Sequence, residues 1–141
     1  MKKIINLFSF LLMLLGSYPA ISWATPYNIA PQARVSASSS IDAGHDAAKV
    51  TDGLIRVPGK GEWVSKSTET FWGQIDYPWI QLDWERPVNI NKIILYDRPA
   101  MEAHVAGGVL HFSDGSTINV WGMANDGTPK EIEFESRKVE W

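Results

Sequence analysis

The chain has 141 residues, of which 13 are Lys or Arg and 16 are Asp or Glu, and it contains no cysteine. Disulfide bonds and a lipid-modified N-terminal cysteine are therefore excluded. No run of basic residues occurs along the chain, so nucleic acid and anionic lipid are poor candidate partners.

Residues 1–24 have the features of a secretory (Sec) signal peptide. Two lysines follow the first methionine, residues 4–15 are mostly apolar, and the small residues Ser22 and Ala24 frame a cleavage site. The apolar run is shorter than the roughly 20 residues that a membrane-spanning helix needs, so an uncleaved anchor is the less favoured alternative. We expect cleavage after Ala24 and export to the periplasm or the medium. The mature domain is then 25–141, and loss of the two lysines changes the net charge from −3 to −5.

Short segments of alternating or continuous apolar residues predict β-strands in the mature part. Residues 90–96 form the most continuously apolar segment, as expected of a strand that is covered on both faces. The only helix-like stretch is 43–53, which predicts one or two turns ended by Gly53. The segments predicted as strands are 33–38, 79–84, 90–96, 107–112, 116–121, 130–135 and 137–141.

The residues between these segments are typical of β-turns. The sequence SDGS at 113–116 has Asp-Gly at its centre and predicts a hairpin, and ANDGTP at 124–129 repeats the pattern. ERP at 85–87 predicts the end of a strand, because proline cannot continue a β-ladder. Strands at intervals of roughly ten residues indicate an antiparallel β-sandwich.

The mature part contains six tryptophans, an unusually large number for a domain of this size. For most of them the favoured interpretation is that large rings fill a small β core. Exported sugar-binding proteins are a second context in which such a content of tryptophan occurs. The six are Trp63, Trp72, Trp79, Trp84, Trp121 and Trp141.

Seven segments in this order resemble the discoidin-like (coagulation factor V/VIII type C) domains of the galactose-binding-like superfamily. The nearest subgroup is an uncharacterised bacterial and fungal set in which LYDRP and FSDGS recur. The resemblance implies an all-β jelly-roll sandwich that binds carbohydrate or another surface through loops at one end, without catalysis. The segments are 28–39, 47–53, 62–65, 78–84, 90–99, 107–116 and 125–134.

The resemblance also implies two features at the end of the chain and in the TDG segment. Family members continue past the position of Trp141 with a further strand or two, so we expect a sandwich that lacks its last strand or strands and self-associates through an exposed edge. Related domains bind structural calcium with a residue at the position of Asp52 and a carbonyl such as that of Lys49. The alternative for Asp52 is a turn in which its carboxylate bonds its own backbone.

Four residues are candidate ligand contacts: Trp72, Tyr77, Arg98 and His104. Exposed aromatic rings near a strand can stack on a sugar, and an arginine can bond its hydroxyls. Trp79 is interpreted instead as a cap of the sandwich, and Trp72 and Tyr77 could equally pack beneath their loop. The alternatives for Arg98 and His104 are an Asp97–Arg98 structural ion pair that orders the following loop, and a solvated loop histidine.

Nothing in the sequence predicts catalysis. The three histidines, His45, His104 and His111, are too scattered for a metal triad, and a hairpin explains Ser113, Asp114 and Ser116. His111 is predicted on the less buried face of its strand. The sequence therefore favours an exported, non-catalytic carbohydrate-binding module. The alternatives are a protein-interaction module that binds no sugar, and a fragment of the accessory domain of a larger secreted enzyme.

Overall fold

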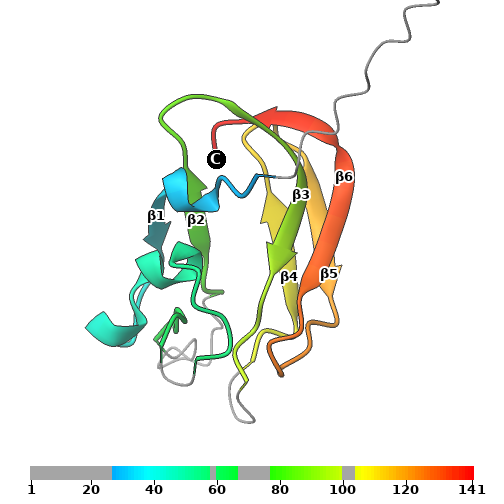
Figure 1. Cartoon of the computed structure of the whole chain (residues 1–141). Helices are drawn as coiled ribbons and strands as arrows, with labels where there is room; N and C mark the ends of the chain where they lie inside the picture. Colours follow the sequence, from blue (N-terminus) through cyan, green and yellow to red (C-terminus); the bar gives the residue numbers. More distant parts are fainter. Residues whose placement is uncertain (1–26, 58–59, 67–76, 100–103) are drawn as a thin grey trace, which may run out of the picture.

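The computed structural model describes residues 27–57, 60–66, 77–99 and 104–141. Within these residues the chain forms six β-strands and three short 3₁₀ helices (Figure 1). The strands are β1 (Arg34–Ala37), β2 (Ile80–Asp83), β3 (Val88–Leu95), β4 (Gly107–His111), β5 (Thr117–Trp121) and β6 (Lys130–Val139). The 3₁₀ helices are η1 (Ala30–Gln32), η2 (Ala43–His45) and η3 (Ala47–Thr51).

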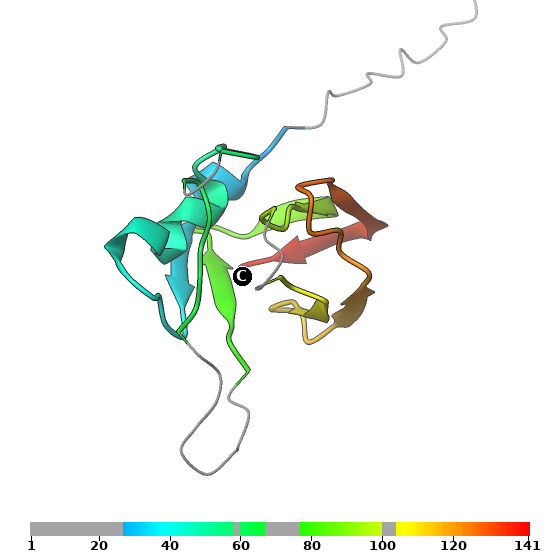
Figure 2. The same ribbon diagram turned by 90° about the horizontal axis from the view of Figure 1, so that it is seen from below.

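The strands pair in three antiparallel ladders: β1 with β2, β3 with β6, and β4 with β5. The predicted all-β antiparallel class is confirmed. Viewed from below, β1, β2 and the 3₁₀ helices lie on one side, and the other two ladders lie on the opposite side (Figure 2). The predicted signal peptide lies outside the described residues, and within those residues no helix is long and apolar enough to cross a membrane.

The hairpin predicted at 113–116 joins β4 to β5, as its Asp-Gly pair indicated. Its turn is closed by a hydrogen bond from the N–H of Gly115 to the carbonyl of Phe112 (2.8 Å). Gly115 has a φ of +84°, which a residue with a Cβ rarely adopts. The N–H of Ser116 donates to the carboxylate of Asp114 (2.8 Å), so these polar residues build the turn.

The second Asp-Gly segment, 124–129, does not form a hairpin, and that prediction is wrong. The turn itself forms, with the Thr128 N–H donating to the carboxylate of Asp126 (2.8 Å). However, it leads from β5 to β6, which belong to different ladders. A turn motif reverses the chain locally, whereas the choice of partner strand depends on contacts between distant residues.

Strand β6 is one strand of ten residues, although the sequence predicted two segments at 130–135 and 137–141. A register shift between Ile90 and Lys92 of β3 accommodates it, because Ile90 pairs with Arg137 and Lys92 pairs with Glu133. Such an irregularity places extra residues on one strand and changes which face its side chains occupy. Phe134 and Arg137 are consequently less exposed than Glu135 and Ser136, which lie between them.

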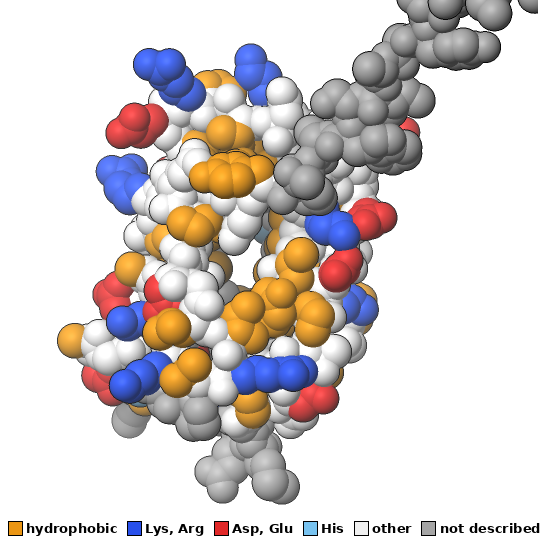
Figure 3. Space-filling model, viewed as in Figure 1, with side chains coloured by type: hydrophobic (Ala, Val, Ile, Leu, Met, Phe, Trp, Pro, Cys, Tyr) orange, Lys and Arg blue, Asp and Glu red, His pale blue; other side chains and the backbone are white. Residues whose placement is uncertain are grey.

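The buried apolar core of the described residues consists of Ala47, Phe112, Val120 and Val139. The segment 90–96 is not covered on both faces, contrary to the sequence prediction, since Ile94 on β3 and Tyr96 just after it are 42% and 44% exposed. Figure 3 shows a hollow between the part that holds β1 and β2 and the part that holds β3 to β6, with hydrophobic side chains along its border.

The tryptophans do not fill the core as a group. Trp63 and Trp84 are half-buried, and their indole N–H groups donate to the carbonyls of Ser39 (2.9 Å) and Ile29 (3.1 Å). The prediction that most of the six fill the core is wrong, because three of them are 52%, 68% and 41% exposed, namely Trp79, Trp121 and Trp141. Alternating patterns identify the two faces of a strand, but they do not show which face another layer covers.

Candidate functional site

One end of the fold gathers segments that are far apart in the sequence. β3 ends there and β4 and β6 begin there, while η2 lies at the same end on the side of β1 and β2 (Figure 1). The segment 60–66 runs next to η2, because the Ile41 N–H donates to the carbonyl of Val64 (2.8 Å) and the Val64 N–H donates to that of His45 (3.4 Å). We call this region the loop end.

Glu62 lies at the centre of a polar cluster at the loop end. Its Oε1 atom accepts a hydrogen bond from Arg98 (3.4 Å) and lies 3.6 Å from Nε2 of His45. The other ring nitrogen of His45, Nδ1, lies 2.8 Å from Oδ1 of Asp42. We call Asp42, His45, Glu62 and Arg98 the Glu62 cluster.

The cluster is partly shielded from water but accessible. The side chains of Glu62, His45 and Arg98 are 18%, 26% and 26% exposed. Asp42 is more exposed and caps η2, accepting from the N–H groups of Gly44 and His45. The hydrogen bond with the His45 side chain is the main reason why the pKa of Asp42 is below its ordinary value. Guanidinium donors and carboxylate acceptors thus lie side by side at a surface, an arrangement that suits a ligand with many hydroxyl groups.

Asp97 closes the loop that carries Arg98 and His104. It is buried, with 6% exposure, and its two carboxylate oxygens accept from the backbone N–H groups of Arg98 and Val105, both at 2.9 Å. The sequence-based alternative, a structural role for this corner, holds for Asp97. The predicted ion pair between Asp97 and Arg98 does not form. Asp97 accepts hydrogen bonds from backbone N–H groups, and the Arg98 side chain pairs with Glu62.

The structure brings together some of the predicted contact residues. Arg98 and His104 lie near the two ends of the loop that Asp97 closes, and His104 is exposed. Tyr77, which is 77% exposed, comes from the segment that leads into β2. Trp72 lies outside the described residues, so its prediction stays open. His111 is exposed at the end of β4, as predicted.

The sequence analysis missed His45 and Glu62 as members of a cluster. The spacing of Asp42 and His45, three residues apart at the start of a helical turn, is a local signal that could have joined these two. No local signal relates Glu62 to Arg98, because 36 residues separate them. Their meeting depends on the three-dimensional arrangement of two loops.

A second arginine ties two loops together near the same end. Arg56 donates from Nε to the carbonyl of Gly127 (3.1 Å) and from its guanidinium to the hydroxyl of Thr128 (3.3 Å). Arg56 has a φ of +59°, an uncommon conformation for a residue with a side chain. These long-range hydrogen bonds hold the strained backbone in place.

Asp52 and Lys49, the predicted calcium ligands, form a hydrogen-bonded turn, and calcium binding stays a prediction. The carboxylate of Asp52 accepts from the N–H of Leu54 (2.9 Å), and the Lys49 carbonyl accepts from the N–H of Asp52 (3.4 Å). Calcium requires roughly six to eight oxygen ligands. Among the described residues, no group of three or more His, Cys, Asp or Glu side chains could hold a metal.

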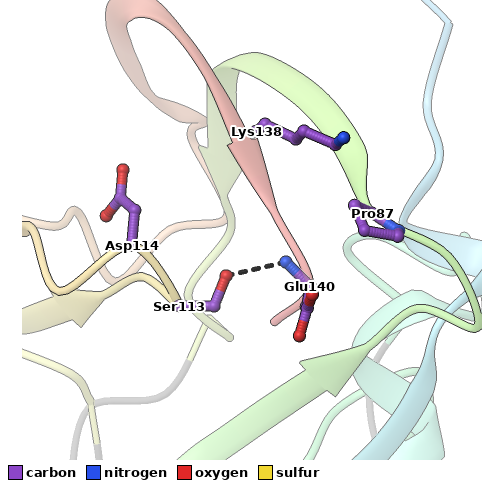
Figure 4. Close-up of a pocket in the computed structure, with 5 residues that line it drawn as sticks. All are labelled: Pro87, Ser113, Asp114, Lys138 and Glu140. Carbon is purple, nitrogen blue, oxygen red and sulfur yellow. Dashed lines mark hydrogen bonds between the residues drawn. The ribbon is translucent and has the colours of Figure 1, made fainter.

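A pocket of about 310 Å³ lies at the opposite end of the strands from Arg98. Figure 4 shows Ser113 on the β4–β5 turn, with its hydroxyl accepting a hydrogen bond from the N–H of Glu140 (2.7 Å). The last residues of the chain are held here as well, because the Trp141 carbonyl accepts from the Ser113 N–H (3.1 Å). The pocket is lined by Pro87, Ser113, Asp114, Lys138 and Glu140.

The fold defines the class as an all-β module of antiparallel strand pairs with polar loops gathered at one end. The chain belongs to the family described as "Domain of unknown function (DUF7402)", whose model matches residues 28–141. Its structure is similar to chitosan-binding module 1 of a chitosanase/glucanase from Paenibacillus sp. IK-5, with a TM-score of 0.60 and 20% sequence identity over 82% of each chain. No curated protein sequence matches the chain. The structural similarity supports the fold, and the discoidin-like resemblance stays an interpretation.

Proposed function

We propose that this protein is an exported, non-catalytic module that binds carbohydrate at the loop end. The observation that carries the proposal is the Glu62 cluster, in which Arg98, Glu62 and His45 from three segments meet at a partly shielded surface. The likeness in fold to a chitosan-binding module supports the same class of ligand.

The contacts in this proposal are few and shallow. Arg98 and Glu62 donate and accept hydrogen bonds with sugar hydroxyls, and the exposed ring of Tyr77 offers a stacking surface. His104 and Trp72 complete the set of candidate contacts. Sites of this kind bind at about millimolar to micromolar concentration, so several copies or a repeating polymer are needed for strong attachment.

The charge of the site favours a sugar that carries an amine. The Glu62 cluster contains two carboxylates, those of Asp42 and Glu62, and one guanidinium, that of Arg98. A carboxylate in a partly shielded site attracts an ammonium group more strongly than one in bulk water. We therefore expect glucosamine oligomers to bind more tightly than neutral glucose oligomers at the loop end.

Titration calorimetry with chitosan hexamer and cellohexaose tests this proposal on the full mature chain. Glu62→Gln and Arg98→Ala each lower the affinity for chitosan hexamer at least fivefold. Arg86→Ala is the matched control, because Arg86 is exposed at the opposite end, next to the corner that precedes β3. Unchanged affinity in Glu62→Gln, Arg98→Ala and Tyr77→Ala together would remove the loop end as the site.

A second candidate function is a protein-interaction module that binds no sugar. It is favoured by the exposed apolar side chains of Ile94 on β3 and of Tyr96 just after β3, and by the small buried core. Light scattering that rises with protein concentration, together with flat sugar titrations, would support this function over the first. A fragment of the accessory domain of a larger secreted enzyme would also bind sugar, so binding data do not distinguish it from the first function. A gene that encodes this domain together with a catalytic domain would identify such a fragment.

Export and calcium are separate proposals. If the exported protein has the mass expected for a chain that begins at Thr25, cleavage of the signal peptide after Ala24 is supported. For calcium, the expected result is a rise in melting temperature on addition of CaCl₂, reversed by EDTA and absent in Asp52→Ala. Equal melting temperatures with CaCl₂ and with EDTA would exclude a structural calcium at Asp52 and Lys49.

A further inference from the structure

The outer face of the β4–β5 hairpin carries the most exposed tryptophan of the described residues. Trp121, the last residue of β5, is 68% exposed although tryptophan usually buries much of its surface. Its cross-strand partner is Gly107, the first residue of β4. A Cβ added at Gly107 would overlap Cε3 of the indole and lie 3.0 Å from Cζ3. The indole thus rests against a residue without a side chain, and most of it faces water.

Two further cross-strand pairs continue the same face. Side chains two residues apart on a strand share a face, and Val109 pairs with Asn119 while His111 pairs with Thr117. The opposite face holds Val120, which is buried and belongs to the core. We call the outer side the Trp121 face, and it consists of Gly107, Val109, His111, Thr117, Asn119 and Trp121.

The size of the Trp121 face limits what can occupy it. Five residues of strand span about 14 Å at roughly 3.4 Å per residue, and the face is two strands wide. A stable protein–protein interface needs about 800 Å² on each partner, far more than this strip offers. A thin, extended ligand fits the strip better than a folded protein.

The chemistry of the face indicates an uncharged ligand with apolar and hydroxyl surfaces. None of its six residues is an acid, a lysine or an arginine, in contrast to the Glu62 cluster and to the acidic chain as a whole. An indole provides a surface for the apolar side of a pyranose ring. The amide of Asn119, the hydroxyl of Thr117 and the imidazole of His111 donate and accept hydrogen bonds with hydroxyl groups.

We propose that the Trp121 face is a second carbohydrate-binding surface, which takes a neutral, extended β-linked glucan chain. It is separate from the Glu62 cluster in residues and in ligand charge, and it goes beyond the function proposed above. Trp121 stacks on a sugar ring, and Asn119 and Thr117 bond hydroxyl groups further along the chain.

The test is a titration of the ¹⁵N-labelled mature protein with cellohexaose, followed by the indole Nε1–H signal of Trp121. This signal is identified by its absence in Trp121→Phe. We expect a saturable shift, at least fivefold weaker binding in Trp121→Ala, and a smaller loss in Trp121→Phe. Trp141→Phe is the control, because it removes another exposed tryptophan outside the face. An unmoved Trp121 signal at millimolar cellohexaose overturns the proposal.

The Glu62→Gln, Arg98→Ala double variant separates the two proposals. If the Trp121 face binds by itself, cellohexaose shifts the Trp121 signal equally in this variant and in the unaltered protein. Loss of the shift in the double variant overturns an independent second surface. A further outcome is that chitosan hexamer binds the unaltered protein while cellohexaose leaves the Trp121 signal unshifted. That result would support the loop end as a site and reject the Trp121 face. The reverse result would reject the loop end alone.

Discussion

The carboxylate of Asp97 accepts hydrogen bonds from its neighbour's N–H and from the N–H of Val105, eight residues further on, both at 2.9 Å. The bond to Val105 closes the loop between β3 and β4. Because Asp97 is 6% exposed, its oxygens cannot readily exchange these donors for water. One buried side chain thus fixes the start and the end of the loop that carries Arg98.

Removal of the Asp97 carboxylate should destabilise the fold and weaken binding at the loop end together. We expect Asp97→Ala to lower the free energy of unfolding by about 2 to 4 kcal/mol, because two part-buried N–H groups lose their carboxylate acceptor. Asp97→Asn keeps one acceptor oxygen, so its loss should be about half as large. Urea unfolding measures both. The exposed Glu85→Ala is the control, expected within about 0.5 kcal/mol of the unaltered protein. Equal stability of Asp97→Ala and Glu85→Ala would contradict the role of Asp97.

Gly127 is required by its backbone conformation and by the closeness of Arg56. Gly127 has a φ of +76°, and a Cβ there would lie 2.6 Å from Cγ of Arg56. We expect Gly127→Ala to lower the free energy of unfolding by about 1 to 3 kcal/mol, since it adds backbone strain and displaces Arg56. Gly108→Ala is the control, because a Cβ there has no atom within 4 Å. If the two variants are equally stable in thermal unfolding, Arg56 does not pack as described.

Acid should unfold this protein through carboxylates that are hydrogen-bonded in the folded state. The hydroxyl and N–H of Ser116 are the main causes of a lowered pKa for Asp114, and the side chain and N–H of Thr128 act in the same way on Asp126. The pKa of Glu133 is lowered chiefly by its hydrogen bond with Lys92. A lowered pKa in the folded state means that the unfolded chain binds protons more readily in acid.

The stability from these groups is present above the unfolded pKa, about 3.9 for Asp and 4.3 for Glu, and is lost as the pH falls below it. We therefore expect the urea midpoint to be nearly constant between pH 5 and 7 and to decrease from pH 4.5 towards pH 2.5. Asp114→Asn should decrease less steeply over that range. The same slope for Asp114→Asn and for the unaltered protein would contradict a role for Asp114.

Local patterns in the sequence predicted the strands well, because alternation and turn residues act over a few positions. The 107–112 and 116–121 segments and the SDGS turn between them became β4, β5 and their hairpin. The pairing of β3 with β6 was not predictable in this way, since their first paired residues, Val88 and Val139, are far apart in the sequence. Local patterns do not record which distant strands meet.

The candidate site was predictable only in part for the same reason. Arg98 was recognised from its position after a buried strand, but its partner Glu62 comes from a separate loop. Trp121 was not singled out as an exposed residue because large rings are usually buried, whereas in the structure the covered face of β5 is the one with Val120. Exposure of a residue depends on which layer covers its strand, and that is a property of the whole fold.

Arg137 packs against two phenylalanine rings, one of which, Phe112, belongs to the buried core. Its guanidinium carbon lies 4.4 Å from the centre of the Phe112 ring and 4.6 Å from that of Phe134. The guanidinium also donates to the hydroxyl of Ser116. Its Nε is buried and has no hydrogen-bond partner among the described residues.

The two rings and the unsatisfied Nε make opposite contributions to stability. Arg137→Ala removes both cation–π contacts and leaves space between the rings, so we expect a loss of about 2 to 4 kcal/mol in the free energy of unfolding. Arg137→Met fills much of that space, places sulfur against the rings and removes the unsatisfied nitrogen, so its loss should be less than half as large. Urea unfolding of both variants at pH 7 distinguishes them. If Arg137→Met is as unstable as Arg137→Ala, the charge of Arg137 rather than its packing stabilises this part of the core.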